Sequence, residues 1–174
     1  MDSSPPDQVA PDGPATNSYY IQSNLKDGFV LTVQNAADGS KIVVMDNKKS
    51  PPSNNQKWFL QYLIANKTTA IISMTTGSDS TQFALDGGAQ GNPLVLSAFN
   101  GNPKPSQQWI DHDNYWQFAS DPTLVMDVAG ANTTAGTSVI LWPRNSPPSN
   151  NQQFTKEDTP AGKCAEAPRP CTVL

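Results

Sequence analysis

The chain has 174 residues, of which 36% are hydrophobic and 15% charged, and its formal net charge is −4. This length accommodates one domain with short tails. The acidic balance disfavours nucleic-acid binding, which needs a basic face. The 16 prolines and 11 glycines, with abundant Asn, Ser and Thr, favour a loop-rich all-β protein over a helical one.

Residues 1–17 are rich in Pro, Ser and Asp and predict a disordered tail. This stretch has no hydrophobic run of the kind that a secretory signal requires. No apolar run elsewhere approaches the roughly 20 residues of a membrane-spanning helix. We therefore expect a cytoplasmic protein.

Four short runs of β-branched and aromatic residues follow, and the same order of runs then returns twice. The runs are YYIQS, FVLTV, KIVVM and QKWFLQY in residues 18–63; TAIIS, QFALD, NPLVLS and QQWI in residues 64–112; and YWQFAS, TLVMDV, TSVILW and QQFTK in residues 113–156. Turn-forming Gly, Asn, Asp and Pro separate them, which is typical of strands about ten residues apart. The pattern predicts twelve short strands in three repeats.

Two further motifs mark the repeats. The heptapeptide SPPSNNQ occurs at residues 50–56 and again at residues 146–152. A Gln-x-aromatic motif occurs three times, with its aromatic residue at Trp58, Trp109 and Phe154. The two heptapeptides thus belong to the first and third members of a set of three. Because one such unit cannot close a core alone, we expect three units around a pseudo-threefold axis, which is a β-trefoil.

The three Gln-x-Trp/Phe motifs and the run MDVAGANTTAGTSVILWPRNSPPSNNQQF resemble the ricin-B-type (R-type) lectin domain, including small fungal lectins of that type. The resemblance covers residues 18–156. It implies a β-trefoil lectin that binds galactose- or GalNAc-type glycans, without catalysis and without a cofactor. In that family a site combines an Asp after the second strand, an aromatic residue fifteen positions later and an Asn-Gln pair.

The third repeat matches this pattern. Asp127 is followed fifteen residues later by Trp142, and Asn151-Gln152 begins the last Gln-x-aromatic motif. The resemblance implies that Asp127 accepts hydrogen bonds from two sugar hydroxyls and that Asn151 bonds the same hydroxyls. Trp142 would stack on the apolar face of the ring, and Gln152 would brace the site. Ile140 departs from the pattern, because the family often has a polar contact there.

The second repeat keeps Asp86 but has Ser97 at the aromatic position and Ser106 at the Asn position. A variant site built from Asp86, Phe99 and Gln107 is the alternative there. One working site per chain would bind weakly, so agglutination would need a homodimer or a second site.

The first repeat has Thr32 in place of the Asp. Counting back nine residues from Asn55 places Asp46 at its aromatic position, so no stacked site is expected there. In all three repeats we interpret the aromatic residue of the Gln-x-aromatic motif as core, together with Gln56 and Gln107.

The sequence contains no motif typical of catalysis or metal binding. The lone histidine, His112, lies between two aspartates where the second and third repeats meet, and we interpret it as part of a solvated loop. The sequence has no Cys/His spacing for zinc, no glycine-rich phosphate loop and no nucleophile motif.

Residues 157–174 predict a flexible tail that ends Cys171-Thr172-Val173-Leu174, which fits the C-a-a-X prenylation pattern. Cys171 is therefore a lipidation candidate, and membrane association is expected only through that lipid. Two alternatives stay open: coincidence, or a disulfide between Cys164 and Cys171, which a reducing cytosol disfavours. Cys164 could also carry a palmitoyl group as a second anchor.

A protease inhibitor is the rival function, since the β-trefoil fold also serves inhibitors that act through an exposed loop. Residues 46–49 and 142–145 each offer a basic residue for such a loop. The inhibitor hypothesis does not require Asp127, Trp142 and Asn151 at lectin spacing, so the lectin hypothesis ranks first.

Overall fold

A computed structural model describes residues 18–47 and 53–159. The first repeat holds β1 (Ser18–Ser23), β2 (Phe29–Val33), β3 (Ile42–Asp46) and β4 (Trp58–Leu63); the second holds β5 (Thr68–Ser73), β6 (Gln82–Asp86), β7 (Val95–Phe99) and β8 (Trp109–Asp111); the third holds β9 (Trp116–Phe118), β10 (Leu124–Val128), β11 (Thr137–Pro143) and β12 (Phe154–Asp158). The predicted all-β fold with twelve strands in three repeats is confirmed. No helix among the described residues is long and apolar enough to cross a membrane.

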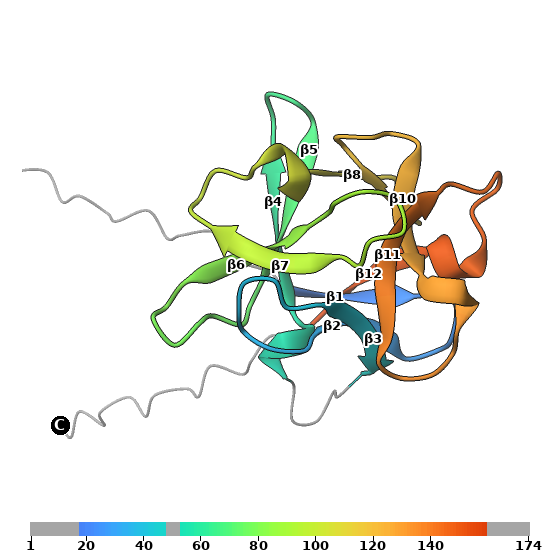
Figure 1. The fold of residues 1–174 in the computed structure, drawn as a ribbon, viewed down its shortest axis with the longest axis horizontal. Coiled ribbons are helices and arrows are strands. Elements are labelled where there is room, and N and C mark those ends of the chain that lie inside the picture. Colours follow the sequence, from blue (N-terminus) through green and yellow to red (C-terminus); the bar gives the residue numbers. More distant parts are fainter. Residues whose placement is uncertain (1–17, 48–52, 160–174) are drawn as a thin grey trace, which may run out of the picture.

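The strands divide into a barrel and three hairpins, as in a β-trefoil (Figure 1). The first and fourth strands of the repeats pair in the order β12–β1–β4–β5–β8–β9. The middle strands form the antiparallel hairpins β2–β3, β6–β7 and β10–β11. Pairing of β3 with β11 joins two of these hairpins to each other.

The Gln-x-aromatic motifs lie in the core, as predicted. Trp58, Trp109 and Phe154 are fully buried in one hydrophobic cluster, and the motif glutamines are buried beside them. The indole N–H of Trp58 donates to the carbonyl of Leu31, and that of Trp109 donates to Leu85, both at 3.2 Å. A short 3-10 turn precedes each motif strand: η1 (Asn54–Gln56), η2 (Pro105–Gln107) and η4 (Asn150–Gln152).

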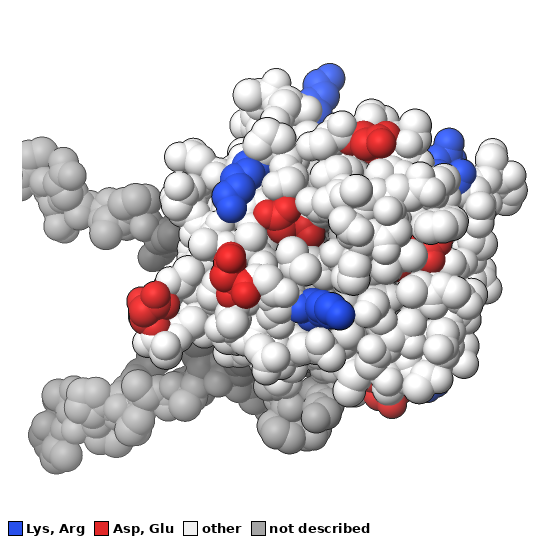
Figure 2. Space-filling model, viewed as in Figure 1, with Lys and Arg blue, Asp and Glu red and all other residues white. Residues whose placement is uncertain are grey.

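The surface of the face seen in Figure 2 is mostly uncharged, with a few Lys, Arg, Asp and Glu side chains of both signs scattered over it. The predictions for residues 1–17, for the rest of the C-terminal segment beyond residue 159 and for Cys164 and Cys171 lie outside the described residues.

Candidate functional site

A pocket of about 410 Å³ lies on the third hairpin. Its lining residues are Asp127, Gly130, Ala131, Ile140, Trp142, Asn145 and Asn151. The structure thus brings together three of the four residues that the sequence predicts for this repeat. The fourth, Gln152, is fully buried behind them.

Strand pairing places the pocket residues. Asp127 of β10 pairs with Ile140 of β11, and Trp142 pairs with Val125, two residues before Asp127. Side chains two residues apart share a face of a strand, so Asp127 and Trp142 are diagonal neighbours. Asp127 is 3% exposed, whereas Trp142 is 44% exposed. The pocket therefore combines a recessed carboxylate with an accessible aromatic ring.

Two amides hold the Asp127 carboxylate in place. Asn151 Nδ2 donates to Oδ1 and Gln152 Nε2 donates to Oδ2, each at 2.9 Å. Gln152 also donates to the carbonyl of Pro143 at 2.9 Å, and Ser149 Oγ donates to Asn151 Oδ1 at 2.7 Å. A carboxylate oxygen has two acceptor positions. Each oxygen of Asp127 therefore keeps capacity for one more donor.

Burial raises the pKa of the Asp127 carboxyl above the ordinary aspartate value of 3.8. The hydrogen bonds from Gln152 and Asn151 act in the opposite direction, because they favour the charged form, but burial is the larger effect.

Gly130, Ala131 and Asn145 line the pocket, although the sequence pattern did not single them out for ligand binding. Gly130 and Ala131 belong to η3 (Ala129–Ala131), which follows β10, and both have positive φ. Asn145 donates its backbone N–H to Gln152 Oε1 at 2.8 Å and its side-chain amide to Ser149 at 2.8 Å. The run Ala129-Gly130-Ala131 directly after the Asp127 strand was the available signal for the turn.

A family model described as the ricin-type beta-trefoil lectin domain matches residues 17–154. The chain belongs to this lectin family. Its domain is therefore a carbohydrate-binding domain.

Solved structures give the same fold. The C-half of an earthworm R-type lectin in complex with GalNAc is 29% identical, with a TM-score of 0.64, and the match covers 82% of this chain and 98% of that one. An earthworm lectin C-terminal domain mutant in complex with 6'-sialyllactose is 28% identical, with a TM-score of 0.62 and the same coverage of 82% and 98%. A designed threefold symmetric protein, ThreeFoil, is 22% identical with a TM-score of 0.63, over 81% of this chain and 98% of that one, and shows the fold alone.

Hairpin register identifies the positions of this ricin-type domain that are equivalent to Trp142. Ser97 pairs with Ala84 and Met45 pairs with Val30, as Trp142 pairs with Val125. The motif glutamine supports this alignment. In each repeat its Nε2 donates to the carbonyl of the residue directly after Met45, Ser97 or Trp142, which is Asp46, Ala98 or Pro143. We call Met45, Ser97 and Trp142 the platform positions.

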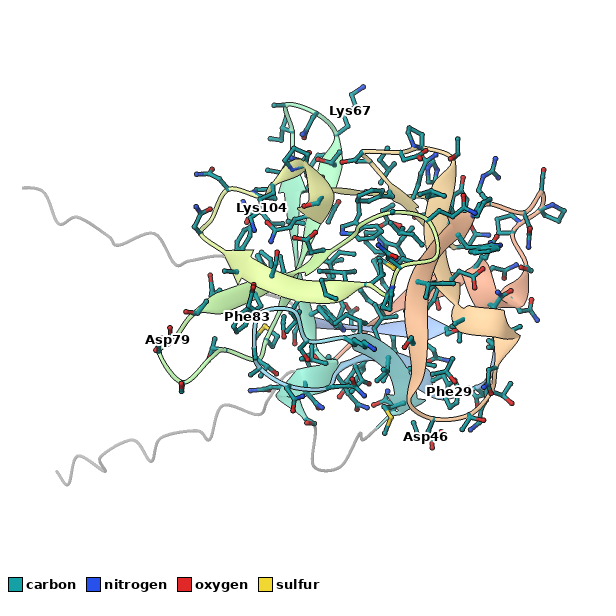
Figure 3. The ribbon with its side chains drawn as sticks, in the orientation of Figure 1. Phe29, Asp46, Lys67, Asp79, Phe83 and Lys104 are labelled. Carbon is teal, nitrogen blue, oxygen red and sulfur yellow. The ribbon has the colours of Figure 1, made fainter. Side chains whose placement is uncertain are left out.

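The assignment of Asp46 to the first platform position was wrong. Met45 to Asn55 spans one residue more than Trp142 to Asn151, so counting back from the asparagine lands one residue late. Asp46 instead lies at the edge of the molecule, near Phe29 in Figure 3, and forms an ion pair of 3.2 Å with Lys26.

The first repeat of this lectin domain repeats the loop scaffold without the carboxylate. Asn55 Nδ2 donates to the carbonyl of Val33 at 3.1 Å, and Gln56 Nε2 donates to Thr32 Oγ1 at 3.2 Å. A pocket of about 410 Å³ lies there, lined by Thr32, Val33, Gln34, Asn35, Val43, Met45 and Asn55. No acid or aromatic ring is among these described residues, in agreement with the expected absence of a stacked site.

The second repeat brings Asp86 and Gln107 together through Ser97. The Ser97 hydroxyl bonds the Asp86 carboxylate and accepts from Gln107 Nε2 at 2.7 Å. Phe99, in contrast, pairs with Gln82 at the far end of the hairpin from Asp86 and is 8% exposed, in a small cluster with Ile72. The variant site is therefore corrected: the structure does not bring Phe99 together with Asp86 and Gln107.

His112 is exposed and lies in a stacked group near the third hairpin. Its ring is 4.4 Å from that of Tyr115, its Nε2 lies 2.8 Å from Gln117 Oε1, and the Arg144 guanidinium lies 5.4 Å from the Tyr115 centroid. Within residues 18–47 and 53–159, no group of three His, Cys, Asp or Glu side chains is placed to hold a metal ion.

Proposed function

We propose that the third-repeat pocket binds a galactose or GalNAc ring at the end of a glycan and performs no chemistry on it. The exposed indole of Trp142 beside the fixed Asp127–Asn151 pair carries this proposal. Two further facts support it. The chain is a ricin-type lectin domain, and a similar earthworm domain has been solved with GalNAc bound.

In the proposed complex, each side of the sugar ring has its own contact. The apolar C–H face of the sugar would stack on Trp142, since aromatic rings present a negative face to polarised C–H groups. Two neighbouring hydroxyls would donate to the free acceptor positions of Asp127, and Asn151 would contact the same hydroxyls. An axial hydroxyl beside an equatorial one, as in a galactose-type ring, presents both to one side while leaving the opposite face free for stacking.

Binding without catalysis fits the residue set. Glycoside hydrolysis ordinarily requires two carboxyl groups flanking the scissile bond. Of the seven described residues that line the pocket, Asp127 alone carries a carboxylate. A shallow site of this kind supports dissociation constants on the order of 1 mM. Multivalent binding would therefore come from a second copy of the chain.

Calorimetric titration with galactose, GalNAc, glucose and mannose tests the proposal directly. We expect the wild-type chain to bind the first two sugars and not the last two. Replacing Trp142 by alanine is expected to weaken that binding about tenfold, because it removes the stacking surface. Lack of binding to every galactoside, on a glycan array as well as in solution, would overturn the proposal.

Galactoside binding is also expected to depend on pH through Asp127. Because its pKa in the folded chain lies above 3.8, the carboxylate becomes protonated at a higher pH than an ordinary aspartate and loses acceptor capacity. A raised folded-state pKa also means that the ionised form opposes folding, so protonation of Asp127 relieves that cost. Affinity should therefore fall before the fold is lost as pH decreases. Titrations at stepped pH, with circular dichroism at each step, measure both.

No observation among the described residues favours the inhibitor hypothesis. In one candidate loop, Trp142 and Asn145 line the pocket and the Arg144 guanidinium lies over Tyr115. In the other, residues 48–49 lie outside the described part of the chain.

A further inference from the structure

Each hairpin ends in a turn that contacts the next repeat. A turn glycine donates its backbone N–H to the residue just before the next platform position: Gly39 to Leu96 at 2.8 Å, Gly91 to Leu141 at 2.7 Å and Gly136 to Val44 at 2.8 Å. All three glycines have positive φ, of 76°, 81° and 90°. The three turns are therefore equivalent, and each is bonded to the strand that carries the platform position of the next repeat.

Only one of these three turns lies close to an aromatic ring. A Cβ atom on Gly91 would lie 3.7 Å from Cζ3 of Trp142, whereas Cβ atoms on Gly39 and Gly136 would meet nothing within 4 Å. This difference between the turns comes from the side chains at the platform positions, since Ser97 does not reach the Gly39 turn and Met45 does not reach the Gly136 turn. The Gly91 turn of the second repeat therefore lies beside the indole of the third repeat.

The loop that carries Gly91 is fixed at both ends. At its start, a Cβ on Gly87 would lie 2.7 Å from the Phe118 ring and 3.1 Å from Leu141, so the backbone is pressed onto the core. At its end, Leu141 donates to the carbonyl of Asn92 at 3.2 Å, and Leu94 donates to Val139 at 2.8 Å. A loop tied down in this way forms a rigid support.

We propose that residues 87–93 of the second repeat position the Trp142 ring for stacking, with Gly91, which bonds the neighbouring Leu141 backbone, as the positioning residue beside it. The pocket is lined by residues of the third repeat, and its aromatic ring is then supported from the second. This inference rests on the proposed function, because stacking on Trp142 is what the support would serve. A ring held in one orientation loses less freedom when a sugar binds, and this favours affinity.

The test compares Gly91→Asn with Gly39→Asn and Gly136→Asn. Asparagine tolerates positive φ better than other side chains, so the three variants carry a similar backbone cost. Only the Gly91 variant places new atoms against Trp142. We expect it to weaken galactoside binding several-fold, up to about the tenfold loss expected for Trp142→Ala, while both controls bind like wild type.

Acrylamide quenching gives a second measurement that needs no ligand. The other three tryptophans, Trp58, Trp109 and Trp116, are fully buried, so quenching reports mainly on Trp142. We expect a change in quenching in Gly91→Asn that neither control shows, with thermal melting confirming that all three variants fold. Unchanged quenching, or changed quenching with wild-type affinity, would overturn the positioning role. Absence of galactoside binding in the wild type would overturn the proposed function instead.

Discussion

Galactoside binding is expected to fall about 100-fold or more, below detection by calorimetry, when Asp127 is replaced by asparagine. Hydrogen bonds to a charged acceptor contribute roughly 1.5–3 kcal/mol each, and the proposed pose has two of them. The substitution keeps the shape of the side chain. It removes the charge and one of the two acceptor oxygens.

The same substitution also disturbs the unliganded site. Asn151 and Gln152 each donate to one Asp127 oxygen, so the new amide group would face one of them donor to donor. An unsatisfied buried donor costs about 1–3 kcal/mol, and a matching fall in the free energy of unfolding is expected. Urea denaturation separates this stability effect from the loss of binding.

Asp86→Asn is the matched control, because Asp86 holds the equivalent position in the second repeat. It bonds Ser97, with no aromatic ring at the platform position. This variant is expected to bind galactosides as tightly as wild type. Wild-type affinity in Asp127→Asn would contradict the third-repeat assignment, and equal losses in both variants would transfer binding to another part of the domain.

Replacing Trp109 by alanine is expected to lower the free energy of unfolding by about 3–5 kcal/mol, the range for truncating a large buried aromatic side chain. Trp109 is fully buried, donates to the carbonyl of Leu85 and packs at 5.3 Å against Phe118. The change would leave a cavity and an unpaired carbonyl in the centre of the fold.

Trp142→Ala provides the comparison for this second prediction, since the same substitution is made at a residue that is 44% exposed. It is expected to lower the free energy of unfolding, measured by urea denaturation, by less than about 1 kcal/mol. Equal destabilisation by the two substitutions would show that Trp142 is a core residue, and this would remove the argument for a stacking surface.

The sequence predicted the fold well because repetition made its pattern redundant. Three Gln-x-aromatic motifs and three sets of four runs indicated the same architecture, so an error in one repeat could not change the result. The third-repeat residues were likewise found through spacing within one hairpin, where strand register follows directly from residue number.

Predictions failed where loop length or tertiary packing decides the outcome. Asp46 was placed one residue late because the loop before Asn55 is longer than its equivalent before Asn151. Phe99 was proposed as a ligand surface, and its burial beside Ile72 depends on strands from outside the β6–β7 hairpin. The placement of the Gly91 turn beside Trp142 joins two repeats, so no spacing within either one could have revealed it.

The turn contacts between repeats also restrict how such a chain could be rearranged. Under the proposed support of Trp142 by the Gly91 turn, the smallest portable binding unit extends across a repeat boundary. Shuffling the repeats, or excising the third, would separate the ring from its support even if every pocket-lining side chain were retained. Circular permutation that keeps the second and third repeats adjacent would preserve both. Under that proposal, gain or loss of binding in the third repeat would depend on two neighbouring repeats together.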